Sequence, residues 1–231
     1  MASSQSRKRG TYHHGNLREA LIDTAFAMIE EDGVESLTIR RVAERIGVTH
    51  AAPSHHFADK NELMLALATE GFARFRTALG SVMHISNPLE RLSAMGRAYV
   101  RFALDHPGAY RLIMGPALSR IQIPAPHAVE SGSLDHRTLA ASEGTFDMLE
   151  STVAEAMQGH TAIGGAGVSG VAFLAWSAMH GAALLFLDEM IDCKLPDDST
   201  DGFPRLLDEV IAFVEAGIAL SPRGASPSSR T

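Results

Sequence analysis

The stretch from residue 37 to residue 57 constrains the fold of this chain more than any other. Its apolar residues Ile39, Val42 and Ile46 recur at spacings of three and four, which predicts a short helix with one buried face. Gly47 follows at a position typical of a helix end, and a second short helix is predicted after the turn. Two short helices joined by a tight turn form a helix-turn-helix, whose second helix can enter the major groove of DNA.

Threonines mark the predicted starts of both short helices. Thr38 precedes the first and Thr49 the second, and at such positions a hydroxyl accepts a hydrogen bond from a free backbone N–H group. The polar side chains of the second helix are His50, Ser54 and His55, which makes them candidate base readers. An ordinary helical hairpin without a DNA role is the alternative for the same pattern.

Helical periodicity continues over most of the remaining chain, without any strand pattern, and this predicts an all-α fold. A helix from Leu17 to Asp32 completes a three-helix N-terminal domain. A longer helix, capped by Asp59 and extending to about His84, can reach into a second domain. Further helices are predicted to follow Asn87 and to span about residues 107–114, 134–158, 168–190 and 206–218, with a loop at 116–133.

The charge is distributed unevenly along the chain. The net charge is −7, but residues 1–60 carry eight basic and eight acidic side chains, so the deficit lies in residues 61–231. Residues 1–18 contain four basic side chains and no acidic one. The positive charge therefore stands where DNA phosphates would lie, while the acidic remainder disfavours non-specific binding of nucleic acid.

The residues around the helix-turn-helix resemble the TetR family of bacterial repressors. The runs Tyr-His-His-Gly-Asn-Leu-Arg at 12–18, His-His-Phe at 55–57 and Asp-Lys-Asn-Glu-Leu at 59–63 occur in order within residues 11–75, at the spacing of that family. Many members carry a phosphate-contacting tyrosine immediately before the second run, but Ser54 stands there in this chain, so that contact is not carried over. The residues expected to contact DNA are Arg7, Lys8, Arg9, Tyr12, Thr38, Arg40, Thr49, His50, Ala51, Pro53, Ser54, His55 and Lys60.

A looser resemblance covers residues 87–190. The runs His-Pro-Gly-Ala-Tyr-Arg at 106–111 and Trp-Ser-Ala-Met-His-Gly at 176–181 are similar to the ligand-sensing half of one TetR subgroup. The resemblance implies a cavity between the middle helices, although a filled core is the alternative. For His180, a core histidine bonded to backbone is favoured over direct contact with a ligand. The residues expected to bind a ligand are Met95, Tyr99, Phe102, Tyr110, Met114, Phe146, Leu149, Phe173, Trp176, Met179 and His180.

The resemblance also implies a homodimer in which the last two long helices of each copy form a four-helix interface. The candidate contacts are Ala182, Leu185, Leu207, Val210 and Val214. The expected domain division is then a flexible basic arm at 1–10, a helix-turn-helix DNA-binding domain at 11–60, a helical ligand-binding and dimerisation domain at 61–220, and a disordered tail at 221–231.

Two further patterns suggest other functions. Residues 165–170 match G-x-G-x-x-G, and Asp188 follows at a distance suited to a ribose contact, but no strand is predicted on either side, so a nucleotide-dependent enzyme is disfavoured. Residues 168–187 carry no formal charge and are long enough to span a bilayer. Acidic residues follow this segment and polar residues interrupt it, which favours a buried helix over a membrane span.

Metal, cofactor and export signals are weak. Eleven histidines are present, but the adjacent pairs 13–14 and 55–56 chelate poorly on a helix, and only one cysteine, Cys193, accompanies them. We therefore expect no metal site, no cofactor and no catalytic machinery. The first residues contain no apolar segment of the signal-peptide type, so we expect a cytoplasmic protein.

These patterns together predict a homodimeric transcription regulator. It is expected to repress by binding a palindromic operator and to be released by a small apolar or amphipathic effector. The alternative is a soluble helical binding protein or enzyme whose N-terminal domain no longer binds DNA, and the absence of the usual tyrosine at Ser54 is the feature that favours it.

Overall fold

The computed structural model describes residues 17–119, 134–158, 165–190 and 202–219, and every regular element within these ranges is helical. The α-helices are α1 (Leu17–Asp32), α2 (Ile39–Ile46), α3 (Lys60–Gly80), α4 (Pro88–Asp105), α5 (Pro107–Met114), α6 (Pro116–Ser119), α7 (Leu134–Ala156), α8 (Val168–Leu187) and α9 (Gly202–Ala219). Two short 3-10 helices accompany them, η1 (Val34–Ser36) and η2 (Ala52–His55).

Helix α2 begins and ends at the predicted residues. The Thr38 hydroxyl accepts a hydrogen bond from the Arg41 backbone N–H at 3.2 Å, which satisfies one of the free donors of the first turn. Gly47 lies in the left-handed region with a φ of 82°, and its N–H donates to the Ala43 carbonyl at 3.0 Å. A residue with a Cβ would be strained at this φ, so the glycine allows the sharp turn.

Side-chain caps also fix the starts of the next two long helices. The Asp59 carboxylate accepts from the Glu62 N–H at 2.9 Å, and the Glu62 carboxylate accepts from the Ala58 N–H at 2.6 Å. This reciprocal pair confirms the predicted cap of α3. At α4, the Asn87 side chain accepts from the two N–H groups that follow Pro88, as its sequence predicts.

The second helix of the helix-turn-helix differs from its prediction. It is the 3-10 helix η2, with Ala51 at its N-cap, and the predicted cap by Thr49 is wrong. An α-helix beginning after Thr49 would need residue 53 to donate to the Thr49 carbonyl, and Pro53 has no N–H group. The Ala52 N–H donates to that carbonyl instead, at 3.0 Å, which gives the tighter 3-10 turn.

One buried cluster joins the N-terminal helices to the rest of the molecule. It begins among α1, α2 and the residues after η2, continues along α3, and extends to α4, α5, α8 and α9. Its most deeply buried members in the N-terminal part include Leu21, Ala25, Leu37, Val42 and Phe57. A second cluster lies where α4, α7, α8 and α9 meet and includes Leu92, Val153, Val171 and Ile218.

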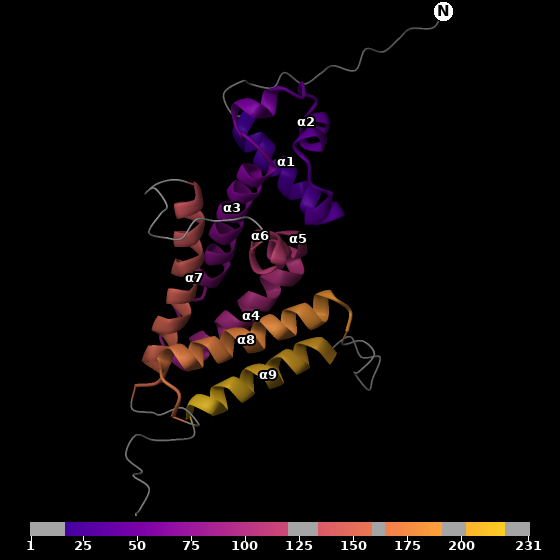
Figure 1. Cartoon of the computed structure of the whole chain (residues 1–231). Helices are drawn as coiled ribbons and strands as arrows, with labels where there is room; N and C mark the ends of the chain where they lie inside the picture. Colours follow the sequence, from indigo (N-terminus) through magenta and orange to yellow (C-terminus); the bar gives the residue numbers. More distant parts are fainter. Residues whose placement is uncertain (1–16, 120–133, 159–164, 191–201, 220–231) are drawn as a thin grey trace, which may run out of the picture.

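Helix α3 connects the two parts of the molecule. It packs against α1 in the N-terminal part and extends along α7 into the larger C-terminal part (Figure 1). It ends at Gly80, short of the predicted His84, because residues 81–84 form turns. Helices α8 and α9 lie side by side at the end of the molecule opposite α1 and α2 (Figure 1).

Other predicted elements need smaller adjustments. Residues 116–119, predicted to be in a loop, form helix α6, and the rest of that predicted loop lies outside the described residues. Helix α8 ends at Leu187, not at Met190, and α9 begins at Gly202, four residues before the predicted start. The predicted basic arm at 1–10 and the predicted tail at 221–231 also lie outside the described residues.

Candidate functional site

The predicted DNA-reading residues lie mostly on the surface of α2, η2 and the turn between them. The exposed ones are Thr38, Arg40, Thr49, His50, Ala51, Ser54 and His55, and Lys60 is half-buried at the start of α3. Pro53 is buried, so its predicted contact with DNA is wrong; it faces the small domain's interior. The Ser54 hydroxyl donates to the Ala51 carbonyl at 2.7 Å within its own turn. Arg7, Lys8, Arg9 and Tyr12 lie outside the described residues.

Two arginines of α2 bind α1. Arg45 forms two hydrogen bonds to the Glu31 carboxylate, at 2.5 and 2.6 Å, and Arg41 forms an ion pair with Asp32 at 2.7 Å. The hydrogen bond from Arg45 holds the pKa of Glu31 below its usual value. The sequence counted these arginines among the positive charges near DNA, but their ion pairs hold α1 and α2 together. Arg40 is the most exposed arginine of α2.

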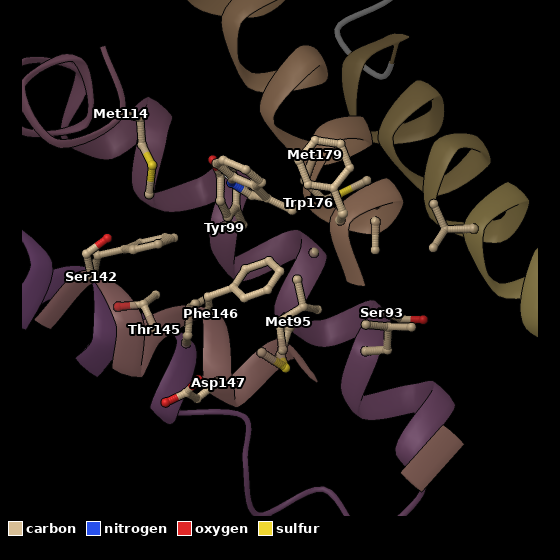
Figure 2. A pocket seen from close by; sticks show the side chains of 18 of the residues that line it. Ser93, Met95, Tyr99, Met114, Ser142, Thr145, Phe146, Asp147, Trp176 and Met179 are labelled. Atoms are coloured by element: carbon tan, nitrogen blue, oxygen red, sulfur yellow. The ribbon is translucent and has the colours of Figure 1, made fainter. Parts of the chain in front are cut away.

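A cavity of about 560 Å³ lies in the C-terminal part, between α3, α4, α5, α7, α8 and α9. Figure 2 shows Tyr99, Phe146 and Trp176 projecting toward its centre, with Met95, Met114 and Met179 around them. Eight of the residues predicted to bind a ligand line it: Met95, Tyr99, Met114, Phe146, Leu149, Phe173, Trp176 and Met179.

Three predicted ligand residues are not in the lining. Phe102 is buried against Phe75, with ring centroids 5.0 Å apart. Tyr110 is completely buried behind Tyr99, and their hydroxyl oxygens are 3.2 Å apart. His180 lies beyond the same tyrosines. The sequence placed these residues on the correct helices but could not tell the cavity wall from the layer that supports it.

The supporting layer is a hydrogen-bonded cluster that we call the tyrosine–histidine cluster: Tyr99, Tyr110, Trp176 and His180. The Trp176 indole N–H donates to the Tyr99 hydroxyl at 3.2 Å. The Tyr110 hydroxyl lies 2.7 Å from Nδ1 of His180, and the Tyr99 hydroxyl lies 3.1 Å from the same nitrogen. The partners of Nδ1 in the His180 ring are therefore tyrosine hydroxyls, and an imidazole with its hydrogen on Nε2 would accept from them at Nδ1.

Burial determines the protonation states in this cluster. It lowers the pKa of His180 below its usual value and raises the pKa of both tyrosines. All four side chains are therefore uncharged near neutral pH. The cluster fixes the orientation of Tyr99 and Trp176, which form part of the cavity wall.

The lining also contains residues that the sequence did not indicate. Phe72, Phe75 and Leu79 of α3 contribute one wall, and Ile211 and Glu215 of α9 contribute another. In the sequence, Phe72, Phe75 and Leu79 follow the same apolar spacing as the core residues of α3. No local signal therefore distinguishes a residue of the cavity wall from a core residue. Polar side chains line it as well: Ser142, Glu143, Thr145 and Asp147 from α7, and Ser93 from α4. Figure 2 shows Ser93, Ser142, Thr145 and Asp147.

The candidate dimer residues fall into two groups. Leu207 is 8% exposed and packs inside this chain, contrary to the prediction that it faces a partner, whereas Val214 is half-buried and also lines the cavity. Ala182 and Val210 are half-buried, and Leu185 is 48% exposed. Other large apolar side chains on α8 and α9 are more exposed, namely Phe173 at 56%, Leu174 at 62% and Phe213 at 81%.

Helix α5 contacts the N-terminal domain directly. The Glu30 carboxylate of α1 accepts hydrogen bonds from the backbone N–H groups of Gly108 and Ala109, at 2.8 and 3.0 Å. A Cβ at Gly108 would overlap the backbone of Ile29 and Glu30, so a glycine is needed for this close approach. The first turn of α5 is thus held on α1, while its last turn, with Ile113 and Met114, lines the cavity.

Features of other kinds of site are few. No group of three or more metal-ligating side chains exists within the described residues. Helix α8 is long and apolar enough to cross a membrane, although a single such helix is weak evidence for a span. Only 28% of its most apolar window is buried within this chain, so the prediction of a buried helix is not borne out here. The glycine-rich run before α8 follows a helix and a segment outside the described residues, and no strand adjoins it in the part of the chain that is described.

Comparison with known proteins agrees with this architecture. Residues 21–67 match the family "Bacterial regulatory proteins, tetR family", and residues 92–210 match "Tetracyclin repressor-like, C-terminal domain". The HTH-type transcriptional repressor KstR2 of Mycobacterium tuberculosis is 32% identical over 108 residues, which are 45% of this chain. The matching segment spans about half the length of that relative, 52%.

Solved structures extend the likeness to nearly the whole chain. A protein of unknown function from Rhodococcus sp. RHA1 is 31% identical, with a TM-score of 0.71 over 91% of this chain and 100% of that one. AibR, solved with isovaleryl coenzyme A and operator DNA, has a TM-score of 0.57 at 22% identity, over 85% of this chain and 96% of its own, and shows a shared fold. With a helix-turn-helix match and a C-terminal match in order along one all-α chain, this protein belongs to the TetR family of bacterial transcription regulators.

Proposed function

We propose that this chain is a ligand-responsive repressor that binds operator DNA and releases it when a small apolar or amphipathic molecule fills the cavity. The observation that carries the proposal is the position of the cavity. Its wall includes Phe72, Phe75 and Leu79 of α3, and the same helix begins immediately after the helix-turn-helix. A ligand in the cavity therefore contacts a helix whose other end is part of the DNA-binding domain.

Release requires a difference in affinity between two arrangements of the protein. A ligand shifts the equilibrium only if it binds the arrangement that does not fit DNA more tightly than the one that does. Helix α3 packs against α1 and follows the helix-turn-helix directly along the backbone, and α5 is held on α1 through Glu30. A change in cavity width can be transmitted through either helix.

We infer that the functional unit is a homodimer formed by α8 and α9. The exposed apolar side chains Phe173, Leu174, Leu185 and Phe213 lie on these two helices, at the end opposite the helix-turn-helix. Several large exposed apolar side chains on two adjacent helices support a subunit interface there. Two-fold symmetry would place two reading surfaces about 34–36 Å apart, which calls for an inverted-repeat operator.

The effector is expected to be small and largely apolar, because most of the lining is aliphatic or aromatic. AibR, which shares the fold, was solved with isovaleryl coenzyme A, so a coenzyme A thioester is one effector class to test. No cofactor and no catalytic step is part of the proposal, and the site of action is the cytoplasm, where the operator is.

A gel shift with DNA from the region beside the protein's own gene tests the proposal. We expect retarded bands that disappear with unlabelled specific DNA, and a footprint with two symmetric halves. The alternative, a soluble ligand-binding protein or enzyme whose N-terminal domain has lost DNA binding, draws support from Ser54. No shift with that DNA or with a pool of genomic fragments, together with ligand binding in the cavity, would favour the alternative.

A further inference from the structure

The charge of the cavity lining indicates the class of its ligand, and this inference rests on the proposed ligand-responsive function. Three lining residues carry carboxylates, Glu143 and Asp147 on α7 and Glu215 on α9. No lysine, arginine or histidine lines the cavity in the part of the chain that is described. An anionic ligand would therefore enter a space whose fixed charges are all of its own sign.

The arginines of α4 are already paired with carboxylates. Arg91 of α4 forms an ion pair with Glu155 at 2.5 Å, and Arg97 with Asp208 at 2.9 Å. None of the three lining carboxylates forms an ion pair with a basic side chain among the described residues. Within the described part of the chain, the negative charge of Glu143 and Asp147 is thus not balanced by an ion pair.

The inner wall offers few hydrogen-bond donors to a ligand. The Trp176 N–H donates to Tyr99, whose own hydroxyl belongs to the tyrosine–histidine cluster. The Thr145 hydroxyl donates to the Ala141 carbonyl at 2.8 Å, and Ser93 is bonded to Glu215. A buried carboxylate or phosphate without a cation or donors is strongly unfavourable, so this wall disfavours anionic head groups. Ser142, at the rim, is the remaining neutral hydroxyl of the lining.

The rim carries the charges that a cationic head group would meet. Glu143 and Asp147 are both exposed and lie four residues apart on α7, where like charges repel and destabilise the helix. Figure 2 shows Ser142 and Asp147 along the α7 side of the cavity. A cation held near these two carboxylates relieves their repulsion, and the apolar walls beside them strengthen the attraction relative to open water.

We propose that the cavity selects amphipathic molecules with an apolar body and a cationic nitrogen head group over anionic molecules with the same body. The body lies among Met95, Phe146 and Trp176, and the nitrogen lies at the rim near Glu143 and Asp147. A volume of about 560 Å³ suits one molecule of this kind, since small-ligand sites span roughly 300–1,000 Å³.

Four probes with one ten-carbon body test the head group: decylammonium, decanol, decanoate and decanoyl coenzyme A. Trp176 is the only tryptophan of the chain and lines the cavity, so its fluorescence reports occupancy in the full-length protein. Each probe is titrated at pH 7, below its micelle concentration. We expect decylammonium to bind at least about fivefold more tightly than decanoate, as two exposed charge contacts would give.

Paired variants assign the preference to the rim. Glu143→Gln with Asp147→Asn should remove most of the preference for decylammonium while leaving decanol affinity unchanged. Asp105→Asn with Glu209→Gln removes two exposed carboxylates outside the lining and should keep the preference, which controls for net charge.

The outcomes separate this inference from the function on which it rests. Equal binding of all probes, tighter binding of decanoate or the coenzyme A thioester, or a preference unchanged in the rim variant would overturn the head-group inference and leave the cavity as a ligand site. If no probe alters Trp176 fluorescence and none weakens operator binding, both the inference and the ligand-responsive function are wrong.

Discussion

His180 is the only member of the tyrosine–histidine cluster that can take up a proton near neutral pH. The cluster therefore stays uncharged only while the His180 imidazole is neutral. Its Nδ1 lies 2.7 Å from the Tyr110 hydroxyl and 3.1 Å from the Tyr99 hydroxyl, and it can accept a hydrogen bond there when the ring hydrogen is on Nε2. A protonated imidazole has no acceptor, so it would reverse the direction of these hydrogen bonds and add a charge beside buried tyrosines. Burial lowers the pKa of His180, which keeps the acceptor form at neutral pH.

We predict that this histidine makes the folded protein less stable in mild acid. In the unfolded chain the imidazole binds a proton as the pH falls through about 6.5, whereas the folded chain binds it only at lower pH. The unfolded state therefore gains protons first, and the free energy of unfolding decreases as the pH falls below 6.5. Urea unfolding between pH 5 and 8 measures this decrease. It should shrink in His180→Gln but persist in His84→Gln, which alters an exposed histidine. An identical pH profile in wild type and His180→Gln would contradict the prediction.

At the scale of elements, the eight residues of helix α5 connect the DNA-binding domain to the cavity. Its first turn receives the Glu30 carboxylate of α1, Tyr110 at its middle joins the tyrosine–histidine cluster, and Met114 at its end lines the cavity. Helix α3 makes the same connection by continuous backbone. The DNA-binding domain is therefore held against the cavity from two sides.

Gly108 tests how tightly α5 is seated on α1. In Gly108→Ala the new Cβ would meet the backbone of Ile29 and Glu30, so the two helices must separate. We expect the free energy of unfolding to fall by about 1–3 kcal/mol, the usual cost of overpacking a close contact. The matched control is Gly144→Ala on α7, where a Cβ meets nothing within 4 Å and should be neutral or stabilise by up to ~1 kcal/mol. Equal urea midpoints for the two variants would show that the close approach is not required.

The ends of the helices could be predicted from the sequence better than the contacts between helices. Thr38, Gly47, Asp59 and Asn87 are local signals, and each begins or ends a helix as its sequence predicts. The predicted cap of the second helix by Thr49 was wrong because Pro53 lacks the N–H that an α-helix beginning there needs.

The site could be predicted only in part. Aromatic residues of α4, α7 and α8 indicated the cavity, but its α3 and α9 walls follow from packing between helices distant in sequence. The contact of Glu30 with Gly108 joins residues 78 apart, and Val214 turns toward the cavity although its helix has apolar residues on more than one face. No local sequence pattern specifies which helix a residue will contact or whether it will face the cavity.

At the scale of the whole molecule, the apolar faces of α8 and α9 predict the oligomeric state. Phe213 is 81% exposed, so replacing it with aspartate should leave the fold of one chain intact while placing an unpaired charge in the proposed interface. We expect Phe213→Asp to sediment as a monomer at micromolar concentration, with helical circular dichroism retained. Val210→Asp is a less specific probe, because Val210 also packs on the core of its own chain. A stable dimer of folded Phe213→Asp would move the interface elsewhere.

The last prediction concerns the coupling of cavity and operator, which is a property of the complete dimer. If ligand and DNA favour different arrangements of the same protein, each must weaken the binding of the other by the same factor. Typical couplings of about 1–3 kcal/mol correspond to roughly 5–150-fold. The measurement is the affinity of the tightest-binding ten-carbon probe, followed by Trp176 fluorescence, with saturating operator, with scrambled DNA of equal length, and without DNA. We expect the probe affinity to fall only with operator, and by the same factor by which the probe weakens operator binding in a gel shift. Equal probe affinities under all three conditions would mean that the cavity, although occupied, does not control DNA binding.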